Sequence, residues 1–234
     1  MREILKPFPQ KRVVLELLKG KSFTRALFNA SISDYKIFGQ VLDLGAKNTS
    51  SGYHTRIRND EASVTFVDLQ GGPGVVQMDV EKDFPFESNQ FDCVISVHLF
   101  EHVRFFQNSA SEINRVLKKD GIFILCLPFF YPYHPDPKDY FRFTLDAIIA
   151  TWVDDSDLDC IQVEFLGPGA ITNQIMPLFD YFQSRLATIF IRAPIYVCLA
   201  SLDFVIFHLT RKKGQHRVSK RFALEHLVVM KKDG

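Results

Sequence analysis

Three acidic side chains accompany successive apolar runs of the sequence. Asp43 lies in VLDLG, Asp68 ends VTFVDL, and Asp79 follows VVQM. A carboxylate can accept hydrogen bonds from both hydroxyls of a ribose, and Asp68 stands at roughly the twenty-residue interval at which nucleotide-binding sheets place one. Asp79 could accept from an adenine amino group, with Val80 as an apolar wall. Each acid alone could be a helix cap or a surface charge, but three at successive strand ends favour a nucleotide site.

The segment VLDLGAKNTSSG places Gly45 and Ala46 directly after the first apolar run. A glycine there lets the backbone approach a ligand closely, and exposed amides of the loop can hold polar groups. Many buried strands end in Asp-Leu-Gly simply to turn, so this segment gains weight only from the acids that follow. Lys47 either crowds a ligand at the loop or points to solvent.

Histidines are the candidate bases outside this loop. His98 directly follows FDCVISV and is expected to face the cleft, although a neighbouring backbone carbonyl could satisfy its ring instead. Glu101 and His102 are an adjacent acid and imidazole that could act as a base. We interpret this pair as structural, or as residues that orient the site.

An aromatic and polar segment, PFFYPYHPDPKDYFRFT, follows the fifth apolar run. Its prolines exclude regular structure, and open α/β sheets bind ligands at the strand ends where it should lie. The candidate substrate-binding residues are Tyr131, His134, Asp136, Asp139, Tyr140 and Arg142. They could recognise hydroxyls or a phosphate, with His134 as a base for an oxygen nucleophile. Alternatively, internal hydrogen bonds and an Asp139–Arg142 pair lock the loop.

The elements that would position these residues alternate along the chain. QVLDLG, SVTFVDL, GVVQMD, FDCVISV and GIFILCLP predict strands, and such continuous apolar runs are typical of a parallel sheet flanked by helices. SASEINRVLKKDG predicts a helix whose last turn contains Lys118 and Lys119, where the helix dipole favours cations. Residues 1–39 predict amphipathic helices that cover one edge of the sheet.

The segment LATIFIRAPIYVCLASLDFVIFHL is strongly apolar and is followed by the basic run RKKGQHRVSKR. Three interpretations stay open: a helical insertion packed on the sheet or in a homodimer, a helix on a membrane surface through residues 186–221, and a transmembrane span. Arg192, Pro194 and Asp203 argue against the span. FALEHLVVMKK predicts a final strand at 221–232, antiparallel to a neighbour.

Composition limits the classes of protein. The 234 residues suit one α/β domain, and 28 basic against 27 acidic side chains give no general attraction to nucleic acid. The four cysteines have no zinc-binding spacing, so we expect no metal site, and all four are interpreted as structural. The N-terminus has no secretory pattern, so a cytoplasmic protein is expected.

Taken in order, VLDLGAKNTSSG, DVEKDFPF, FDCVISVHLFEHV and EINRVLKKDG resemble the motifs of class I S-adenosylmethionine-dependent methyltransferases over residues 40–128. The resemblance implies a Rossmann-like α/β fold, with a mostly parallel seven-stranded sheet, helices on both faces and an antiparallel C-terminal strand. It implies a single domain with a helical cover at 1–39, a cofactor-binding core at 40–170, an apolar helical insertion at 175–215 and the final strand.

The resemblance also implies site roles. Asp43, Gly45 and Ala46 would contact the methionine part of S-adenosylmethionine, Asp68 the ribose, Asp79 the adenine, and Val97 with His98 the floor of the site. The whole expected cofactor set is Asp43, Gly45, Ala46, Asp68, Leu69, Asp79, Val80, Val97 and His98. The usual second glycine of the loop is replaced by Lys47, which leaves open a degenerate fold acting as a scaffold or membrane-associated partner.

The segment after the fifth strand resembles methyltransferases encoded among bacterial polysaccharide-assembly enzymes. This resemblance implies O-methylation of a small molecule or a saccharide, including a lipid-linked one. Methyl transfer needs little chemical help beyond holding the acceptor in line, so an obvious catalytic residue is not required. A nicotinamide-dependent reductase fits less well, because the loop lacks G-x-G-x-x-G.

Overall fold

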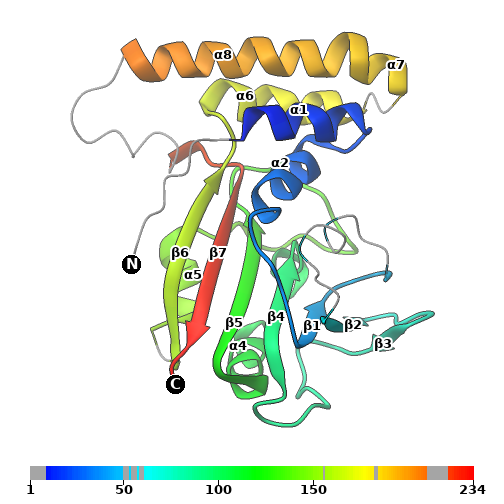
Figure 1. Ribbon diagram of the computed structural model, residues 1–234, viewed down its shortest axis with the longest axis vertical. Coiled ribbons are helices and arrows are strands. Elements are labelled where there is room, and N and C mark those ends of the chain that lie inside the picture. The colour runs from blue at the N-terminus through cyan, green and yellow to red at the C-terminus, as the bar shows by residue number, and fades with distance from the viewer. Residues whose placement is uncertain are drawn as a thin grey trace.

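A seven-stranded sheet forms the centre of the computed structural model, which describes residues 9–49, 53, 57, 61–154, 156–181, 184–209 and 221–234 (Figure 1). The strand order is β3-β2-β1-β4-β5-β7-β6. The strands are β1 (Gln40–Leu44), β2 (Ser63–Asp68), β3 (Val75–Gln77), β4 (Phe91–Val97), β5 (Leu117–Pro128), β6 (Leu158–Leu166) and β7 (Glu225–Lys232).

The five strands from β3 to β5 are parallel, whereas β7 pairs antiparallel with both β5 and β6. This arrangement confirms the expected fold class, including the antiparallel strand near the C-terminus. Because β1 has β2 on one side and β4 on the other, the chain reverses its direction of travel across the sheet at β1. Open α/β sheets bind ligands at such a switch point.

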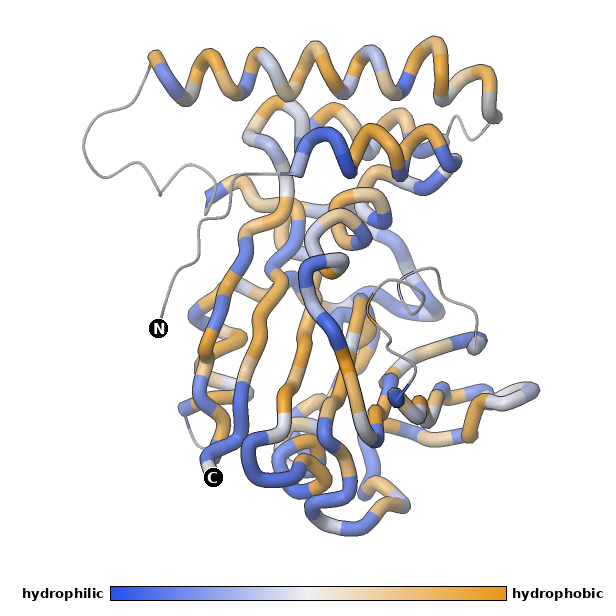
Figure 2. The backbone as a smooth tube through the Cα atoms, in the orientation of Figure 1, coloured by the Kyte–Doolittle hydropathy of each residue, from blue (hydrophilic) through white to orange (hydrophobic). Residues whose placement is uncertain are grey.

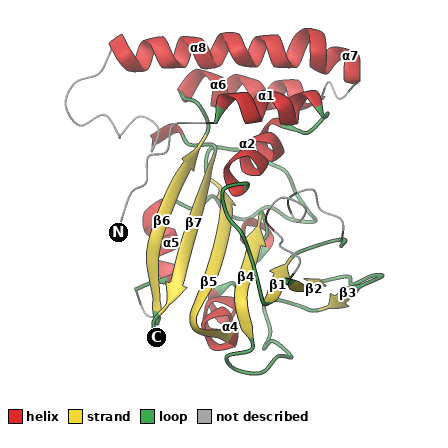
Figure 3. Cartoon of the chain, in the orientation of Figure 1, coloured by secondary structure: helices red, strands yellow, loops and turns green. Residues whose placement is uncertain are grey.

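Helices cover both faces of the sheet (Figure 3). They are α1 (Gln10–Leu18), α2 (Phe23–Ile32), α4 (Gln107–Val116), α5 (Leu145–Trp152), α6 (Ala170–Ile175), α7 (Arg185–Ala187) and α8 (Ala193–Leu209), with 3-10 turns η1 (Phe100–His102) and η2 (Met176–Tyr181) and a π-helical turn η3 (Thr188–Arg192). Since successive strand residues point to opposite faces, neighbours on one strand enter different cores. Leu42 belongs to the buried cluster that includes residues of α4 and α5, and Val41 belongs to the cluster that includes residues of α1 and α2.

The apolar sides of the N-terminal helices join the core on one face of the sheet, whereas the sequence led us to expect these helices at an edge. Val13 of α1 and Phe23 of α2 share a buried cluster with Ile95 and Ile124, which lie on the central strands β4 and β5. The amphipathic pattern predicts that these helices are half-buried, but it cannot say which part of the sheet receives their apolar sides.

The boundary between α4 and β5 also differs from expectation. The helix ends at Val116, and Leu117 already pairs with Phe91 of β4. Residues 118–121 bulge out before pairing resumes at Ile122. Lys118 is held over β4 because its Nζ lies 2.8 Å from both carboxylate oxygens of Asp92, so it is not available to the helix terminus. The strand β6 was not among the segments predicted from sequence.

A layer of helices lies beyond one end of the sheet, with α8 outermost and α1 and α6 beneath it (Figure 1). Two buried charges attach α8 and the preceding turn η3 to this layer. Arg192 is fully buried and its Nη2 donates to Asp180 Oδ1 at 2.7 Å and to the carbonyl of Lys21 at 2.9 Å. Asp203 accepts from the amides of Ile171 and Thr172, at the start of α6, at 3.1 and 2.8 Å.

The outer side of this layer is apolar (Figure 2). Leu186, Phe190, Phe204 and Leu209 are each more than half exposed. Residues 188–206 form a helical segment long and apolar enough to cross a membrane, with 28% of its residues buried. Arg192 and Asp203, the two charges that argue against a membrane span, therefore form contacts within the domain.

Candidate functional site

The end of β1 is fixed from inside the protein. Asp43 is fully buried, and Tyr53 Oη donates to its Oδ2 at 2.7 Å. Burial, with Asp43 beside it, raises the pKa of Tyr53 well above its usual value, so the phenol keeps its proton and remains a donor. Asp43 thus holds the loop after β1 through Tyr53, a residue that the sequence motif did not single out.

The turn at Gly45 is tight. Its φ of +79° is costly for other residues, and a Cβ at this position would lie 3.0 Å from Leu99. The amides of Gly45 and Ala46 both donate to the carbonyl of Val67, at 2.9 and 3.0 Å. These two amides therefore join the turn to β2.

Asp68 ends β2 with one carboxylate oxygen engaged. Its Oδ1 accepts from the amide of Gln70 at 3.0 Å, and among the described residues its Oδ2 has no hydrogen-bonding partner. Leu69, next to it, is 56% exposed. A half-buried carboxylate with one oxygen held, and the other without a partner in the described part of the chain, is suited to accept from a ribose hydroxyl.

Asp79 and Val80 follow the third parallel strand. Asp79 caps its own turn, because Oδ1 accepts from the amide of Glu81 at 3.1 Å, and its Oδ2 lies 3.5 Å from Lys82 Nζ. Val80 is buried in the core on the α4 side. The structure therefore gives Asp79 a local capping role beside the adenine contact expected of it.

His98 lies at the end of β4 in a small polar cluster. Its Nε2 is 3.4 Å from Oε2 of Glu225, and the Cys126 thiol donates to the same oxygen at 3.4 Å. Burial by itself would lower the pKa of His98, but Glu225 outweighs it and the pKa is raised. Val97 is half-buried just before it. Glu225 begins β7, about 130 residues after His98, and no local motif marked it.

The loop after β5 is locked by its own charges. Arg142 donates to both oxygens of Asp139, at 2.5 and 2.7 Å, and to the carbonyls of Tyr131 and Pro132. Asp139 also accepts from the amide of His134 at 2.8 Å. Mainly through Arg142, the pKa of Asp139 falls from 3.8 to about 2. Asp139 and Arg142 thus fix the shape of the loop. This agrees with the alternative stated from the sequence, in which an Asp139–Arg142 pair locks the loop.

Other predicted residues of the loop are more accessible. Tyr140 is 45% exposed, while Tyr131 packs edge-on against the His134 ring at 4.7 Å between centroids. The loop also reaches the loop after β1, because Lys47 forms an ion pair with Asp136. Lys47 is well exposed and is held toward the β5 side, so it neither enters the core nor extends freely into solvent.

Glu101 and His102 are the last two residues of the turn η1 and lie beside the same loop. The carbonyl of Glu101 accepts from the amides of Tyr140 and Phe141, at 2.7 and 3.2 Å, and His102 Nδ1 lies 2.6 Å from the carbonyl of Lys138. The adjacent acid and imidazole therefore join η1 to the loop after β5. This agrees with the interpretation that they orient the site.

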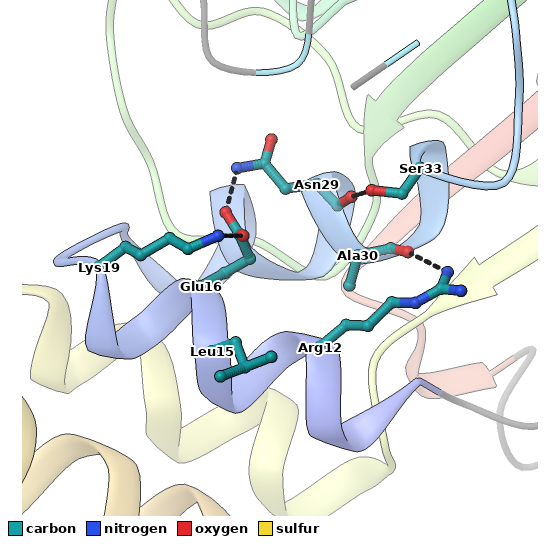
Figure 4. A pocket seen from close by; sticks show the side chains of 7 residues that line it. All are labelled: Arg12, Leu15, Glu16, Lys19, Asn29, Ala30 and Ser33. Carbon is teal, nitrogen blue, oxygen red and sulfur yellow. Dashed lines mark hydrogen bonds and ion pairs between the residues drawn. The ribbon is translucent and has the colours of Figure 1, made fainter. Parts of the chain in front are cut away.

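A separate hollow of about 280 Å³ lies between α1 and α2 (Figure 4). Glu16 crosses it, accepting from Lys19 Nζ at 2.9 Å and from Asn29 Nδ2 at 2.8 Å. The lining residues are Arg12, Leu15, Glu16, Lys19, Asn29, Ala30 and Ser33. None of them was predicted to bind cofactor or substrate, and the predicted residues gather instead at the carboxyl ends of the strands.

Residues 42–125 match the family model described as a methyltransferase domain. This part of the chain is therefore similar to a methyltransferase domain. No curated relative matches the sequence. The domain explains why the acids and the glycine turn gather at the switch point of the sheet.

Solved structures share the fold of this methyltransferase domain. The [4+2]-cyclase SpnF has a TM-score of 0.59 at 14% identity, covering 99% of both chains. A Haloferax volcanii complex with the Trm112 methyltransferase activator has a TM-score of 0.55 at 15% identity, covering 100% of both. Haemonchus contortus phosphoethanolamine N-methyltransferase 2 with S-adenosyl-L-methionine has a TM-score of 0.52 at 16% identity, covering 88% of this chain and 52% of that chain. The methyltransferase domain and this last complex support S-adenosylmethionine as the cofactor.

Proposed function

We propose that the protein transfers a methyl group from S-adenosylmethionine to a hydroxyl oxygen of a small molecule or saccharide, including a lipid-linked saccharide. The observation that carries this proposal is Oδ2 of Asp68 at the end of β2, which accepts no hydrogen bond among the described residues and lies beside the tight turn at Gly45. A backbone turn without a Cβ and a carboxylate for a ribose are what a nucleoside cofactor needs at this edge.

S-adenosylmethionine supplies a methyl group activated by its sulfonium. The protein then has to bind the nucleoside at Asp68, hold the acceptor in line, and receive the hydroxyl proton. His98 suits the last task, because Glu225 stabilises the protonated ring at Nε2 and leaves Nδ1 as the atom that would accept the proton. His134, the other predicted base, has both ring nitrogens close to oxygen atoms.

The acceptor would lie against the loop after β5. Tyr140 offers an exposed ring and hydroxyl, and aromatic rings beside polar groups suit the faces and hydroxyls of a sugar. Asp139 and Arg142 would keep the loop in shape, and the Lys47–Asp136 pair would hold it beside the cofactor loop. Oxygen is preferred as the methylated atom because of the histidine with its carboxylate partner.

Calorimetric titration with S-adenosylhomocysteine tests the cofactor site, because this product analogue binds without turnover. The Asp68→Ala variant should bind about 10- to 100-fold more weakly, as expected for loss of a hydrogen bond to a charged group. Asp159→Ala is the matched control, since Asp159 is exposed on the edge strand β6. Folded wild-type protein that does not bind at all would favour the alternative, a non-catalytic scaffold with the methyltransferase fold.

A second proposal concerns location: the outer side of α8 lies on an anionic membrane surface, where a lipid-linked acceptor would be found. The exposed apolar residues of α8 support it, together with the basic run that follows in the sequence. Residues 210–220 of that run lie outside the described residues. A cytoplasmic protein with peripheral membrane contact is consistent with this arrangement.

Sedimentation with vesicles of phosphatidylcholine and phosphatidylglycerol tests this location. Phe190→Glu should reduce the bound fraction several-fold, because a charge replaces a ring that is 74% exposed. Phe38→Glu is the control, since Phe38 is 61% exposed but lies before β1. Self-association of wild-type protein without vesicles, abolished by Phe190→Glu, would instead assign this surface to a homodimer.

A further inference from the structure

One carboxylate and two imidazoles meet where η1 approaches the loop after β5. Oε1 of Glu101 lies 3.8 Å from Nε2 of His102 and 3.5 Å from Nε2 of His134. The three ligand atoms all lie within 4.8 Å of one another. Two ligands bound tetrahedrally to one metal ion at about 2.1 Å are about 3.4 Å apart, so this spacing is that of a metal site.

The carboxylate of Glu101 lacks the partners that a buried charge needs. The residue is 0% exposed, and among the described residues neither of its oxygens accepts a hydrogen bond. A buried carboxylate without compensation is costly, and native proteins pair such groups or bind metals with them. The separations of 3.5 and 3.8 Å from the two rings exceed the usual hydrogen-bond length of about 2.7–3.2 Å.

The tautomers of both rings follow from the opposite nitrogens. His102 Nδ1 is 2.6 Å from the carbonyl of Lys138, and His134 Nδ1 is 3.0 Å from the carbonyl of Pro132. A carbonyl only accepts, so each Nδ1 carries hydrogen, and in the neutral ring Nε2 then has a lone pair. Arg142 Nη2 is farther from His134 Nδ1, at 3.3 Å, and already donates to Asp139 and Pro132.

Both Nε2 lone pairs therefore lie near a carboxylate oxygen, an arrangement that is repulsive until a cation separates them. Histidine ligands of metals characteristically donate their other nitrogen to a carbonyl, as both rings do here. The loop between the two histidines is fixed by the amides of Tyr140 and Phe141 on the Glu101 carbonyl. The three donors are thus positioned by the fold without a bound ion.

We propose that Glu101, His102 and His134 bind a divalent transition-metal ion, with Zn²⁺ or Fe²⁺ favoured by two imidazoles and one carboxylate. Three protein ligands leave coordination positions open. If the proposed methyl transfer is correct, an oxygen of the acceptor would occupy one of them, because the site lies on the same sheet edge as Gly45 and Asp68. The expectation from cysteine spacing, that the protein has no metal site, did not consider these residues.

A second cluster of possible ligands, His98, Cys126 and Glu225, is less suited to a metal. Its members are engaged with one another, because the thiol and the imidazole both lie 3.4 Å from Oε2 of Glu225. Burial raises the pKa of Cys126 well above its usual value, so the sulfur stays a thiol, whereas metals bind the thiolate. This cluster is the alternative metal site against which the test compares the proposed one.

Titration of chelator-treated full-length protein with ZnCl₂ by calorimetry, with CoCl₂ as a spectroscopic probe, tests the site. Wild type should bind one ion per chain, and Glu101→Gln and His134→Ala should each weaken binding by on the order of 100-fold. His208→Ala is the control, because this histidine lies on α8. Circular dichroism of each variant shows that the fold is retained.

Three results would overturn the proposal: no binding by folded wild type, equal binding by Glu101→Gln and His134→Ala, or loss confined to Cys126→Ser with a thiolate-to-cobalt absorption band. Titration of the same samples with S-adenosylhomocysteine separates this proposal from the proposed function. Cofactor binding without metal binding would contradict the proposed metal site and leave the proposed methyl transfer standing. Metal binding without cofactor binding would contradict the proposed methyl transfer and leave the metal site standing.

Discussion

Buried charges are treated differently in two regions of this molecule, the helical layer around α8 and the carboxyl edge of the sheet. In the helical layer, Arg192 meets Asp180 and a carbonyl, and Asp203 receives the amides at the start of α6. At the sheet edge, Glu101 is equally buried but its carboxylate oxygens accept no hydrogen bond among the described residues. A charge with partners stabilises packing, whereas one without them indicates a missing ligand.

The largest effect is expected at Arg192. Arg192→Met should lower the free energy of unfolding by about 3–5 kcal/mol, because it leaves Asp180 largely buried without its cation. Urea unfolding followed by circular dichroism measures the loss, and Arg192→Met combined with Asp180→Asn should recover part of it. Arg12→Met, which breaks an exposed pair with Asp34, should cost about 1 kcal/mol or less. Equal losses at Arg192 and Arg12 would contradict the comparison.

A smaller loss is expected at Asp203. Asp203→Ala should destabilise the protein by about 2 kcal/mol, since two amides and the Thr172 hydroxyl at the start of α6 lose their acceptor. Asp203→Asn keeps one acceptor oxygen and should cost less in the same urea experiment. If both variants unfold like wild type, α8 is not held by this cap.

The contribution of Asp139, in the loop after β5, to the stability of the protein should depend on pH. The folded pKa of Asp139, about 2, lies below its usual 3.8 mainly because of Arg142. A depressed carboxyl pKa gives stability that is fully present above the unfolded pKa and is lost as pH falls toward the folded one. The stability difference between wild type and Asp139→Asn should therefore shrink from pH 4 to pH 2. A difference that stays constant over this range would show that Arg142 does not lower the pKa of Asp139.

The smallest change in stability, and the sharpest contrast, is expected at Glu101. In chelator-treated protein, Glu101→Gln should leave the free energy of unfolding within about 1 kcal/mol of wild type, because the substitution removes a charge that lacks partners. The same urea experiment measures it. A loss of more than about 2 kcal/mol would mean that the carboxylate is paired, with a protonated ring, and the contrast with Arg192 would fail.

The five parallel strands could be predicted from sequence, because each contains a continuous apolar run. The strand β6 could not, since LDCIQVEFL alternates with charges and has the weak pattern of an edge strand. The α4–β5 boundary was misplaced because two lysines and a glycine are typical of a helix end. Here Asp92, on a neighbouring strand, binds Lys118.

For the site, sequence predicted which residues lie at the strand ends but not which way they face. The orientation of Lys47 depends on Asp136, 89 positions later. Glu101 and His102 carry a motif, but His134 joins them only because the path of the loop after β5 is set by backbone hydrogen bonds to Glu101. Such contacts depend on tertiary structure, and a local pattern of residue types does not specify them.

The position of β7 between β5 and β6 also has a consequence during synthesis. In the sheet of the described residues β6 is an edge strand whose neighbour is β7, and about 60 residues separate the end of β6 from Glu225. At roughly 5–20 residues per second, a ribosome needs about 3–12 s to make that stretch. During this time the nascent chain has a strand with no partner and an open edge on β5. We expect chaperones that shield exposed strands to matter most for this chain in that interval.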